Sequence, residues 1–249
     1  PVAGNIGMPA LDLLEGAIPD VVVLELSSFQ LEATDSLKAK AAAILNLSPD
    51  HMDRYATVAQ YLHAKQRILN GAITGIVSRD DPTLQAMEVS GAAEIISFGL
   101  DAPLRAVDYG IAADPHGDDW IVRGDVRILP VASLSMTGRH NVMNALAALA
   151  LIESAGYPAN PAALATLSAF RGLPHRCELV LEREGVLWIN DSKGTNPGAA
   201  EAALVGLDRP VVLIAGGQSK DADFSTLAQA IQRYARQVLL IGEDRVALA

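Results

Sequence analysis

The stretch DVVVLELSS, residues 20–28, decides the fold class of this chain. Its apolar run leads through Glu25 into two serines, which is typical of a buried strand that ends in a polar turn. The stretch AAILNLSP, residues 42–49, has the same design and stops at Pro49. Helical spacing of apolar residues follows at 58–69. Because strands alternate with helices, the sequence predicts parallel βαβ units and an α/β fold with a mainly parallel sheet.

Further elements extend this pattern and divide the chain in two. Between residues 102 and 131 the pattern changes, and a hairpin across Gly124-Asp125 predicts a small antiparallel insert. The segment FRGLP, residues 170–174, precedes a second series of strands and helices. We therefore expect one domain over 1–172 and a second, Rossmann-like domain over 173–249. The other predicted elements are strands at 75–78, 94–98, 210–215 and 237–241, helices at 83–89, 141–154, 161–168, 196–204 and 224–234, and a hairpin of 177–181 with 186–190.

The composition excludes several classes of protein. Half of the 249 residues are apolar but only 4% are aromatic, so the core is expected to consist of aliphatic side chains, as in parallel sheets covered by helices. The formal net charge of −10 argues against nucleic acid or an anionic membrane as partner, although a local basic site can still bind phosphate. A single cysteine, Cys177, excludes an intrachain disulfide and is typical of a reducing compartment such as the cytoplasm.

The ends of the chain and its apolar stretches lead to two expectations. No apolar stretch approaches the roughly 20 residues that span a bilayer, so we expect no membrane insertion. The chain starts at Pro1 without a leader and stops at Ala249 without a terminal signal. We therefore expect it to be a piece of a longer protein.

Polar side chains follow the predicted strands of the first domain, at the edge where open α/β sheets bind ligands. Glu25 interrupts an apolar strand, and such a carboxylate is either a rim or helix-capping group or an oxygen ligand for Mg2+. The segment DHMD, residues 50–53, is either a solvated turn or the source of a ligand, His51. Lys65 lies on the predicted helix 58–69, where a solvated surface lysine is the commoner outcome.

Two clusters lie near the predicted domain boundary. Asn141 and Asn144 are three residues apart at a helix start, so they share a face. That face could bind the edge of a purine, or Asn141 could simply cap the helix. In LPHR, residues 173–176, Arg176 could clamp a phosphate or form an interdomain ion pair.

Two more clusters follow strands of the second domain. In NDSKGTNP, residues 190–197, Asp191 could hold ribose hydroxyls, and Lys193 could bind an anion at the start of the next helix. A capped strand–helix loop alone would not require this Asp and Lys. In GGQSKDAD, residues 216–223, Lys220 could bind a carboxylate, although two glycines after a strand are common.

These segments together, and in this order, resemble the motifs of the Mur ligase family over essentially the whole chain. The matching stretches are ELSSFQLE at 25–32, DHMDRY at 50–55, GRHNVMN at 138–144, LPHR at 173–176 and NDSKGTN at 190–196. The resemblance implies a UDP-binding domain, then a central ATPase domain, then a Rossmann-like domain. It also implies ATP-driven amide formation in peptidoglycan precursor synthesis, in which D-glutamate joins UDP-N-acetylmuramoyl-L-alanine through an acyl phosphate.

The resemblance assigns a role to individual residues. Glu25 resembles a ligand of the Mg2+ that bridges the ATP phosphates, and His51 a ligand of a second Mg2+. Lys65 resembles a lysine that reacts with CO2 to give a carbamate, which would turn a cation into a bidentate metal ligand. The catalytic set is then His51, Lys65 and Lys193. The ATP contacts implied are Asn141, Asn144, His175, Arg176 and Asp191, and the substrate contacts implied are Asn5, Ser27, Thr195 and Lys220.

One motif of the family is absent from the chain. The P-loop, G-x-x-x-x-G-K-[ST], lies upstream of Pro1 in the family, so we expect the isolated chain to be inactive and the full-length protein to be a monomeric ligase. Two other functions stay open: a sister ligase for another amino acid or for folate, and a non-catalytic nucleotide-binding scaffold. The segment 191–196 and Lys220 argue against the sister ligase.

Overall fold

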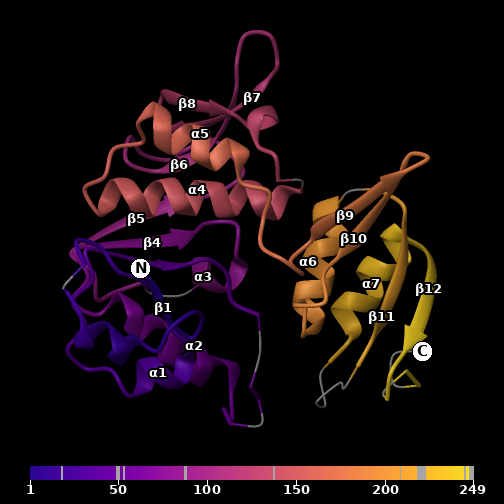
Figure 1. Cartoon of the computed structure of the whole chain (residues 1–249), viewed down its shortest axis with the longest axis horizontal. Coiled ribbons are helices and arrows are strands. Elements are labelled where there is room, and N and C mark those ends of the chain that lie inside the picture. Colours follow the sequence, from indigo (N-terminus) through magenta and orange to yellow (C-terminus); the bar gives the residue numbers. More distant parts are fainter. Residues whose placement is uncertain are drawn as a thin grey trace. The chain divides into compact units, whose positions relative to one another are not determined.

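The computed structural model describes residues 1–17, 19–48, 51–52, 54–86, 89–136, 138–207, 209–217, 223–243 and 245–246. The chain forms two compact units, one of residues 1–97 with 153–157 and one of residues 98–152 with 158–249. Helices and strands alternate in the first unit and in the C-terminal part of the second, which confirms the α/β fold (Figure 1). None of the boundaries between these two units falls at residue 172, and the predicted domain division there stays a prediction.

The first unit is built on parallel strand pairs. Its strands are β1 (Val2–Gly4), β2 (Val23–Glu25), β3 (Ala41–Ile44), β4 (Thr74–Ser78) and β5 (Glu94–Phe98). β1 pairs in parallel with β2, β3 pairs in parallel with β4, and β5 follows β4 in the strand order. The strand predicted around residues 20–26 is thus confirmed but shorter, because only three residues of β2 have partners in β1.

The helices of this unit begin where a side chain caps them. They are α1 (Ser28–Glu32), α2 (Val58–Gln66) and α3 (Pro82–Ala86), with 3-10 turns η1 (Ala10–Glu15) and η2 (Arg67–Leu69). Ser27 starts α1 and Thr57 starts α2, each by accepting a hydrogen bond from a backbone N–H of the first turn. α1 and α2 lie side by side (Figure 1). The core under them includes Ala42, Ile44, Tyr55, Tyr61, Leu69 and Val77.

The second unit begins with the predicted antiparallel insert. Its first elements are β6 (Tyr109–Ala113), β7 (Asp119–Arg123), β8 (Val126–Pro130), the 3-10 turn η3 (Val131–Ser133), α4 (Arg139–Ser154) and α5 (Pro161–Ala169). β6, β7 and β8 form an antiparallel meander, and Tyr109 of β6 pairs in parallel with Phe98. The hairpin across Gly124-Asp125 is confirmed, with Gly124 at a φ of 52°.

The C-terminal part of the second unit repeats the alternation of strands and helices. Its elements are β9 (Glu178–Arg183), β10 (Val186–Asn190), α6 (Pro197–Leu207), β11 (Val211–Gly216), α7 (Ser225–Tyr234) and β12 (Ala235–Ile241). β9 and β10 form the predicted hairpin, and β11 pairs in parallel with β12. α6 packs against α7 through Leu204, Leu227 and Ala230 (Figure 1). Among the described helices, none has the length and hydropathy of a membrane-spanning helix.

Candidate functional site

The ends of β1 and β2 bring two predicted ligands, Asn5 and Glu25, together. The Asn5 backbone N–H donates to the Glu25 carbonyl at 2.6 Å, and Asn5 Nδ2 donates to Glu25 Oε1 at 3.2 Å. Both residues are exposed. A carboxylate that accepts one hydrogen bond keeps further lone pairs, so this pair can present Glu25 to a cation.

Gly4 makes this approach of two chains possible. It pairs in register with Glu25 and has a φ of +110°. A Cβ at this position would lie 2.4 Å from the Glu25 carbonyl oxygen, closer than atoms can approach. Only glycine therefore allows Asn5 to reach Glu25 in this geometry.

Ser27, a predicted substrate contact, starts helix α1. Its Oγ accepts from the Gln30 backbone N–H at 3.3 Å, and its own N–H donates to Gln30 Oε1 at 2.9 Å. This reciprocal pair is a capping box. The hydroxyl thus has a structural task, and contact with substrate stays a prediction.

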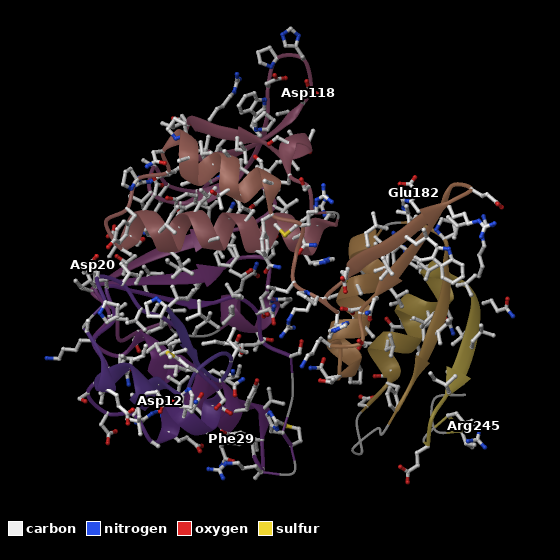
Figure 2. All side chains as sticks on the ribbon, in the orientation of Figure 1. Asp12, Asp20, Phe29, Asp118, Glu182 and Arg245 are labelled. Carbon is white, nitrogen blue, oxygen red and sulfur yellow. The ribbon has the colours of Figure 1, made fainter. Side chains whose placement is uncertain are left out.

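His51 is held in a turn against an aromatic ring. Its backbone has a φ of 57°, and its carbonyl accepts from the N–H groups of Arg54 and Tyr55 at 2.9 and 3.1 Å. The imidazole meets the ring of Phe29 edge-on, with centroids 4.9 Å apart. Figure 2 labels Phe29, which projects from α1. Phe29 and the turn together fix the direction of the His51 side chain.

The Lys65 side chain is half-buried on α2, so it is not the fully solvated surface lysine that is the commoner outcome. Its Nζ lies 5.8 Å from the ring centroid of Tyr61, one helical turn earlier. Tyr61 meets Tyr55 at 5.4 Å, and Tyr55 stacks on Phe29 at 6.3 Å. A chain of aromatic contacts therefore connects Lys65 to the ring that holds His51. This position suits the ammonium form, because a cation is attracted to a ring face.

The described residues test one part of the predicted metal site, namely whether protein side chains alone form it. Within them, no three His, Cys, Asp or Glu side chains gather into a cage. Asp50 and Asp53, which flank His51, lie outside the described residues. Mg2+ commonly uses one or two carboxylates together with phosphate oxygens and water. The exposed carboxylate of Glu25 fits that mode, whereas a site made wholly of protein ligands is not formed by the described side chains.

A cavity of about 740 Å3 adjoins these residues without including them. It is lined by Glu32, Arg54, Tyr55, Ala59, Gln60, His63, Ala64 and Arg67. Inside it, Arg54 Nη2 donates to Glu32 Oε2 at 2.6 Å, and this bond lowers the pKa of the Glu32 carboxyl. The sequence did not predict this cavity, because none of its lining residues was singled out as a ligand, although Glu32, Arg54 and Tyr55 lie at the ends of two matching motifs.

The loops before β9 and after β10 form a second cluster of predicted residues. His175 lies at a φ of 64°, and its Nδ1 is 2.8 Å from Asn190 Nδ2. The Lys193 N–H donates to the His175 carbonyl at 3.0 Å. The Cys177 N–H donates to Asp191 Oδ1 at 3.0 Å. These bonds bring His175, Asp191 and Lys193 into one cluster, and their roles in binding stay predictions.

Burial and Asp191 together set the protonation state of the Cys177 thiol. Burial, together with the charge and hydrogen bonding of Asp191, raises the pKa of Cys177 from 9.0 to about 12. A thiol with so high a pKa is protonated at neutral pH, which disfavours nucleophilic chemistry at Cys177. Its part in the cluster is the backbone N–H that it gives to Asp191.

The remaining predicted residues fall into three groups. Asn141 and Asn144 share a face of α4, where Asn144 Nδ2 donates to Asn141 Oδ1 at 3.3 Å. Asn141 lies inside α4, which begins at Arg139, so it is not the helix cap. A carboxamide has further donors and acceptors beyond this bond. The side chains that are exposed near the second cluster are those of Arg176, Lys193 and Thr195. Lys220 lies outside the described residues.

Two residues of the second cluster were missed at the sequence level. Asn190 contacts the His175 ring, and Glu178 Oε2 accepts from the His175 N–H at 2.8 Å. Asn190 directly precedes Asp191 at the end of a predicted strand, so its position was a usable signal. Glu178 carried none, because it lies within the strand pattern of β9.

Known proteins match this chain over its whole length. Residues 5–152 match the model of the Mur ligase middle domain, and residues 175–249 match that of the Mur ligase, glutamate ligase domain. The UDP-N-acetylmuramoylalanine--D-glutamate ligase of Methylobacillus flagellatus is 50% identical over 248 residues, which are 100% of this chain and 54% of that protein. The ligase of the same name from Nitrosococcus oceani is 50% identical over 97% of this chain and 53% of its own length. The chain thus spans about half the length of the curated relatives it matches.

Solved structures agree on the fold. MurF ligase from Thermotoga maritima in complex with ADP has a TM-score of 0.62 at 15% identity, over 90% of this chain and 58% of that chain. Mycobacterium tuberculosis folylpolyglutamate synthase complexed with ADP has a TM-score of 0.60 at 21% identity, over 88% of this chain and 51% of that one. These likenesses concern the fold alone. Since the middle-domain model covers more than half of the chain and the second model most of the rest, the chain belongs to the Mur ligase family.

Proposed function

We propose that the full-length protein containing this chain is an ATP-dependent ligase that adds D-glutamate to UDP-N-acetylmuramoyl-L-alanine in peptidoglycan precursor synthesis. The observation that carries the proposal is the 50% identity, over the whole chain, to relatives that bear the name of this reaction. Two clusters of predicted residues, one at the ends of β1 and β2 and one between the loops around β9 and β10, support it.

The first cluster, together with Ser27, His51 and Lys65, is proposed to bind the phosphates and the uridine-nucleotide substrate. Glu25, oriented by Asn5, would hold one Mg2+, and His51 with Lys65 as its carbamate would hold a second. When bound, Mg2+ would neutralise charge on the phosphates during transfer. For Lys65 to act as a carbamate, its Nζ must leave the face of Tyr61, because an anion is not attracted to that ring face. Asn5 and Ser27 would contact the uridine-nucleotide substrate.

The second cluster, together with Asn141, Asn144 and Lys220, is proposed to bind ATP and the incoming amino acid. Asn141 and Asn144 would bind the adenine, Asp191 the ribose, and His175 with Arg176 the phosphates. The side chains proposed for the reacting groups and the D-glutamate carboxylates are Lys193, Thr195 and Lys220. The exposed cations Arg176 and Lys193 suit anionic ligands, since Arg binds phosphate with two parallel N–H bonds.

Several finer properties belong to the same proposal. The domain division at 172/173 would separate the ATPase part from the Rossmann-like part. We further propose a monomer in the cytoplasm that neither inserts into membranes nor binds nucleic acid. Because residues 1–249 contain no G-x-x-x-x-G-K-[ST], the chain alone would lack the lysine that holds the β- and γ-phosphates and would be inactive.

Phosphate release by the full-length protein tests the proposed function. The assay contains ATP, Mg2+, UDP-N-acetylmuramoyl-L-alanine and D-glutamate, with L-glutamate and L-lysine as matched controls. Release that requires both D-glutamate and the uridine nucleotide supports the proposal. Release with another amino acid would assign the protein to a sister ligase. No release from folded protein would favour the nucleotide-binding scaffold.

A further inference from the structure

Three arginines surround a small cavity at the start of strands β11 and β12. The cavity has a volume of about 370 Å3 and is lined by Arg209, Pro210, Arg233, Tyr234, Ala235 and Arg236. The proposed ligand-binding residues of the C-terminal part lie in the loops before β9, after β10 and after β11 instead. β11 runs through six residues from Val211 to Gly216, so the cavity lies about 16 Å from the other end of that strand. It belongs to neither candidate cluster.

Each arginine comes from a different element. Arg209 precedes β11, and Arg233 lies in the last turn of α7. Arg236 is the extra residue of a β-bulge, because the pairing passes from Val211–Ala235 directly to Val212–Gln237. A bulge re-aims a side chain out of the normal alternation, and bulges in parallel pairs are rare.

Among the described residues that line this cavity, the charged side chains are all arginines and none is Asp or Glu, although acidic residues outnumber basic ones by 29 to 19 in the chain. Asp208, which precedes Arg209, lies outside the described residues. Within the described residues, none of the three arginines forms an ion pair. Arg233 lies over the ring of Tyr234 at 5.2 Å, and its place at a helix C-terminus is favourable by itself. That explanation does not extend to Arg209 and Arg236, which are not on the helix.

We propose that this cavity binds a small phosphate-bearing anion. Arginine offers a planar fork of N–H donors that matches phosphate oxygens, and three such forks supply donors without acceptors. The volume lies within the range of small-molecule sites, about 300–1,000 Å3. Three positive charges favour a multiply charged phosphate over a singly charged carboxylate. The site does not depend on the proposed ligase function.

Arginine-specific modification tests the proposal at each residue separately. The full-length protein reacts with phenylglyoxal with and without inorganic pyrophosphate, in the absence of Mg2+ and nucleotide, and peptide mass spectrometry gives the rate at each arginine. At twice the dissociation constant, pyrophosphate should slow modification of Arg209 and Arg236 about threefold. Arg127 and Arg183, exposed arginines on other strands, are the matched controls and should react at unchanged rates.

Two further arms identify the ligand and the site. Inorganic phosphate should protect at higher concentration than pyrophosphate, and succinate at equal ionic strength should not protect. Arg236→Gln should abolish the protection of Arg209, whereas Arg127→Gln should leave it intact. If a thermal melt shows that Arg236→Gln is unfolded, Arg209→Gln with Arg236 as the reporter replaces it.

Three results would overturn the proposal. Equal rates at Arg209 and Arg236 with and without pyrophosphate would mean that the cavity does not bind it. Equal protection by succinate would mean a non-selective basic patch. Protection of Arg209 that survives Arg236→Gln would mean that the arginines do not form one site.

Discussion

Substituting Gly4 by alanine tests the geometry at the ends of β1 and β2. The new Cβ would lie 2.4 Å from the Glu25 carbonyl oxygen, whereas ordinary contacts begin at 3.4 Å. One of the two strand ends must therefore move by about 1 Å, because the obstacle is backbone and not a flexible side chain. The movement separates Asn5 from Glu25, which are joined by bonds of 2.6 and 3.2 Å.

The magnitude follows from two contributions. A non-glycine residue in the left-handed region costs about 1–2 kcal/mol. Loss of two hydrogen bonds adds about 1 kcal/mol each. Gly4→Ala should therefore destabilise its unit by about 3–4 kcal/mol, which corresponds to a fall in thermal midpoint of about 12–32 °C for a unit of roughly 100 residues.

A matched pair of variants separates the collision from the backbone strain. Gly117 has a φ of +90° and nothing lies within 4 Å of the point that a Cβ would occupy, so Gly117→Ala carries only the strain. Gly16 has a φ of −129° and equally open surroundings, so Gly16→Ala should be nearly neutral. Calorimetric midpoints of the full-length protein should rank Gly4→Ala lowest, Gly117→Ala next and Gly16→Ala nearest the parent.

Activity gives an independent readout of the same displacement. Because Glu25 is the proposed Mg2+ ligand, Gly4→Ala should lower phosphate release by about a hundredfold, the typical effect of a 1 Å misplacement. Gly117→Ala should leave release unchanged once the protein is folded. If Gly4→Ala melts and reacts like Gly117→Ala, the close approach of Gly4 to Glu25 is wrong.

Three further predictions concern Cys177, Glu25 and the Arg54–Glu32 pair. Cys177 should react with iodoacetamide at pH 8 about a thousandfold more slowly than a free thiol, because its pKa of about 12 leaves little thiolate. Asp191→Asn should accelerate the reaction. A fast reaction in the parent protein would contradict the raised pKa of this thiol. Glu25→Gln should raise the Mg2+ concentration needed for half-maximal phosphate release, since an amide oxygen is a weaker ligand than a carboxylate; an unchanged requirement would remove Glu25 from the metal site. The Arg54 bond lowers the pKa of Glu32, so its stabilisation is present above the ordinary value of 4.5 and is lost as pH falls through the lowered pKa. Arg54→Gln should make the thermal midpoint less dependent on pH in that acidic range. If the pH dependence of the midpoint is the same in the variant and the parent, this exposed pair does not contribute to stability.

Local signals predicted most of the fold. The helix expected at 58–69 is α2 with its 3-10 continuation, because Thr57 caps it and Gly71, at a φ of +71°, follows it. The hairpin of β7 with β8 was readable because Gly124 can adopt the positive φ that its turn needs. In each case the decisive residues lie within a few positions of the element that they define.

Short elements that depend on distant partners were missed. β1 has three residues, and its pairing with β2 joins Val2 to Val23, so the strand is specified by a segment about twenty residues away. α1 has five residues, too few for a helical repeat to show. Its capping pair, Ser27 with Gln30, was the available signal.

For the candidate site, too, the sequence indicated single residues but not which of them contact one another. Sequence motifs marked Asn5 and Glu25 separately, but their hydrogen bond depends on β1 and β2 being paired. They also marked His175 and Asp191, whose contacts cross the β9–β10 hairpin. The sequence shows which residue types stand at strand ends, whereas the register of the paired strands determines which of these residues contact one another.

Backbone strain near Arg176 argues for a ligand-facing role over an interdomain ion pair. His175 and Cys177, on either side of it, have φ values of 64° and 46°, and turn chemistry explains neither in the way that the β9–β10 turn explains Glu184 at 54°. Left-handed non-glycine residues persist only where surrounding bonds determine them. Here those bonds run to Glu178, Asp191 and the Lys193 N–H, while the Arg176 side chain stays exposed. An exposed ion pair contributes about 0–1 kcal/mol and would not offset two strained residues, which supports the proposed contact of Arg176 with a phosphate.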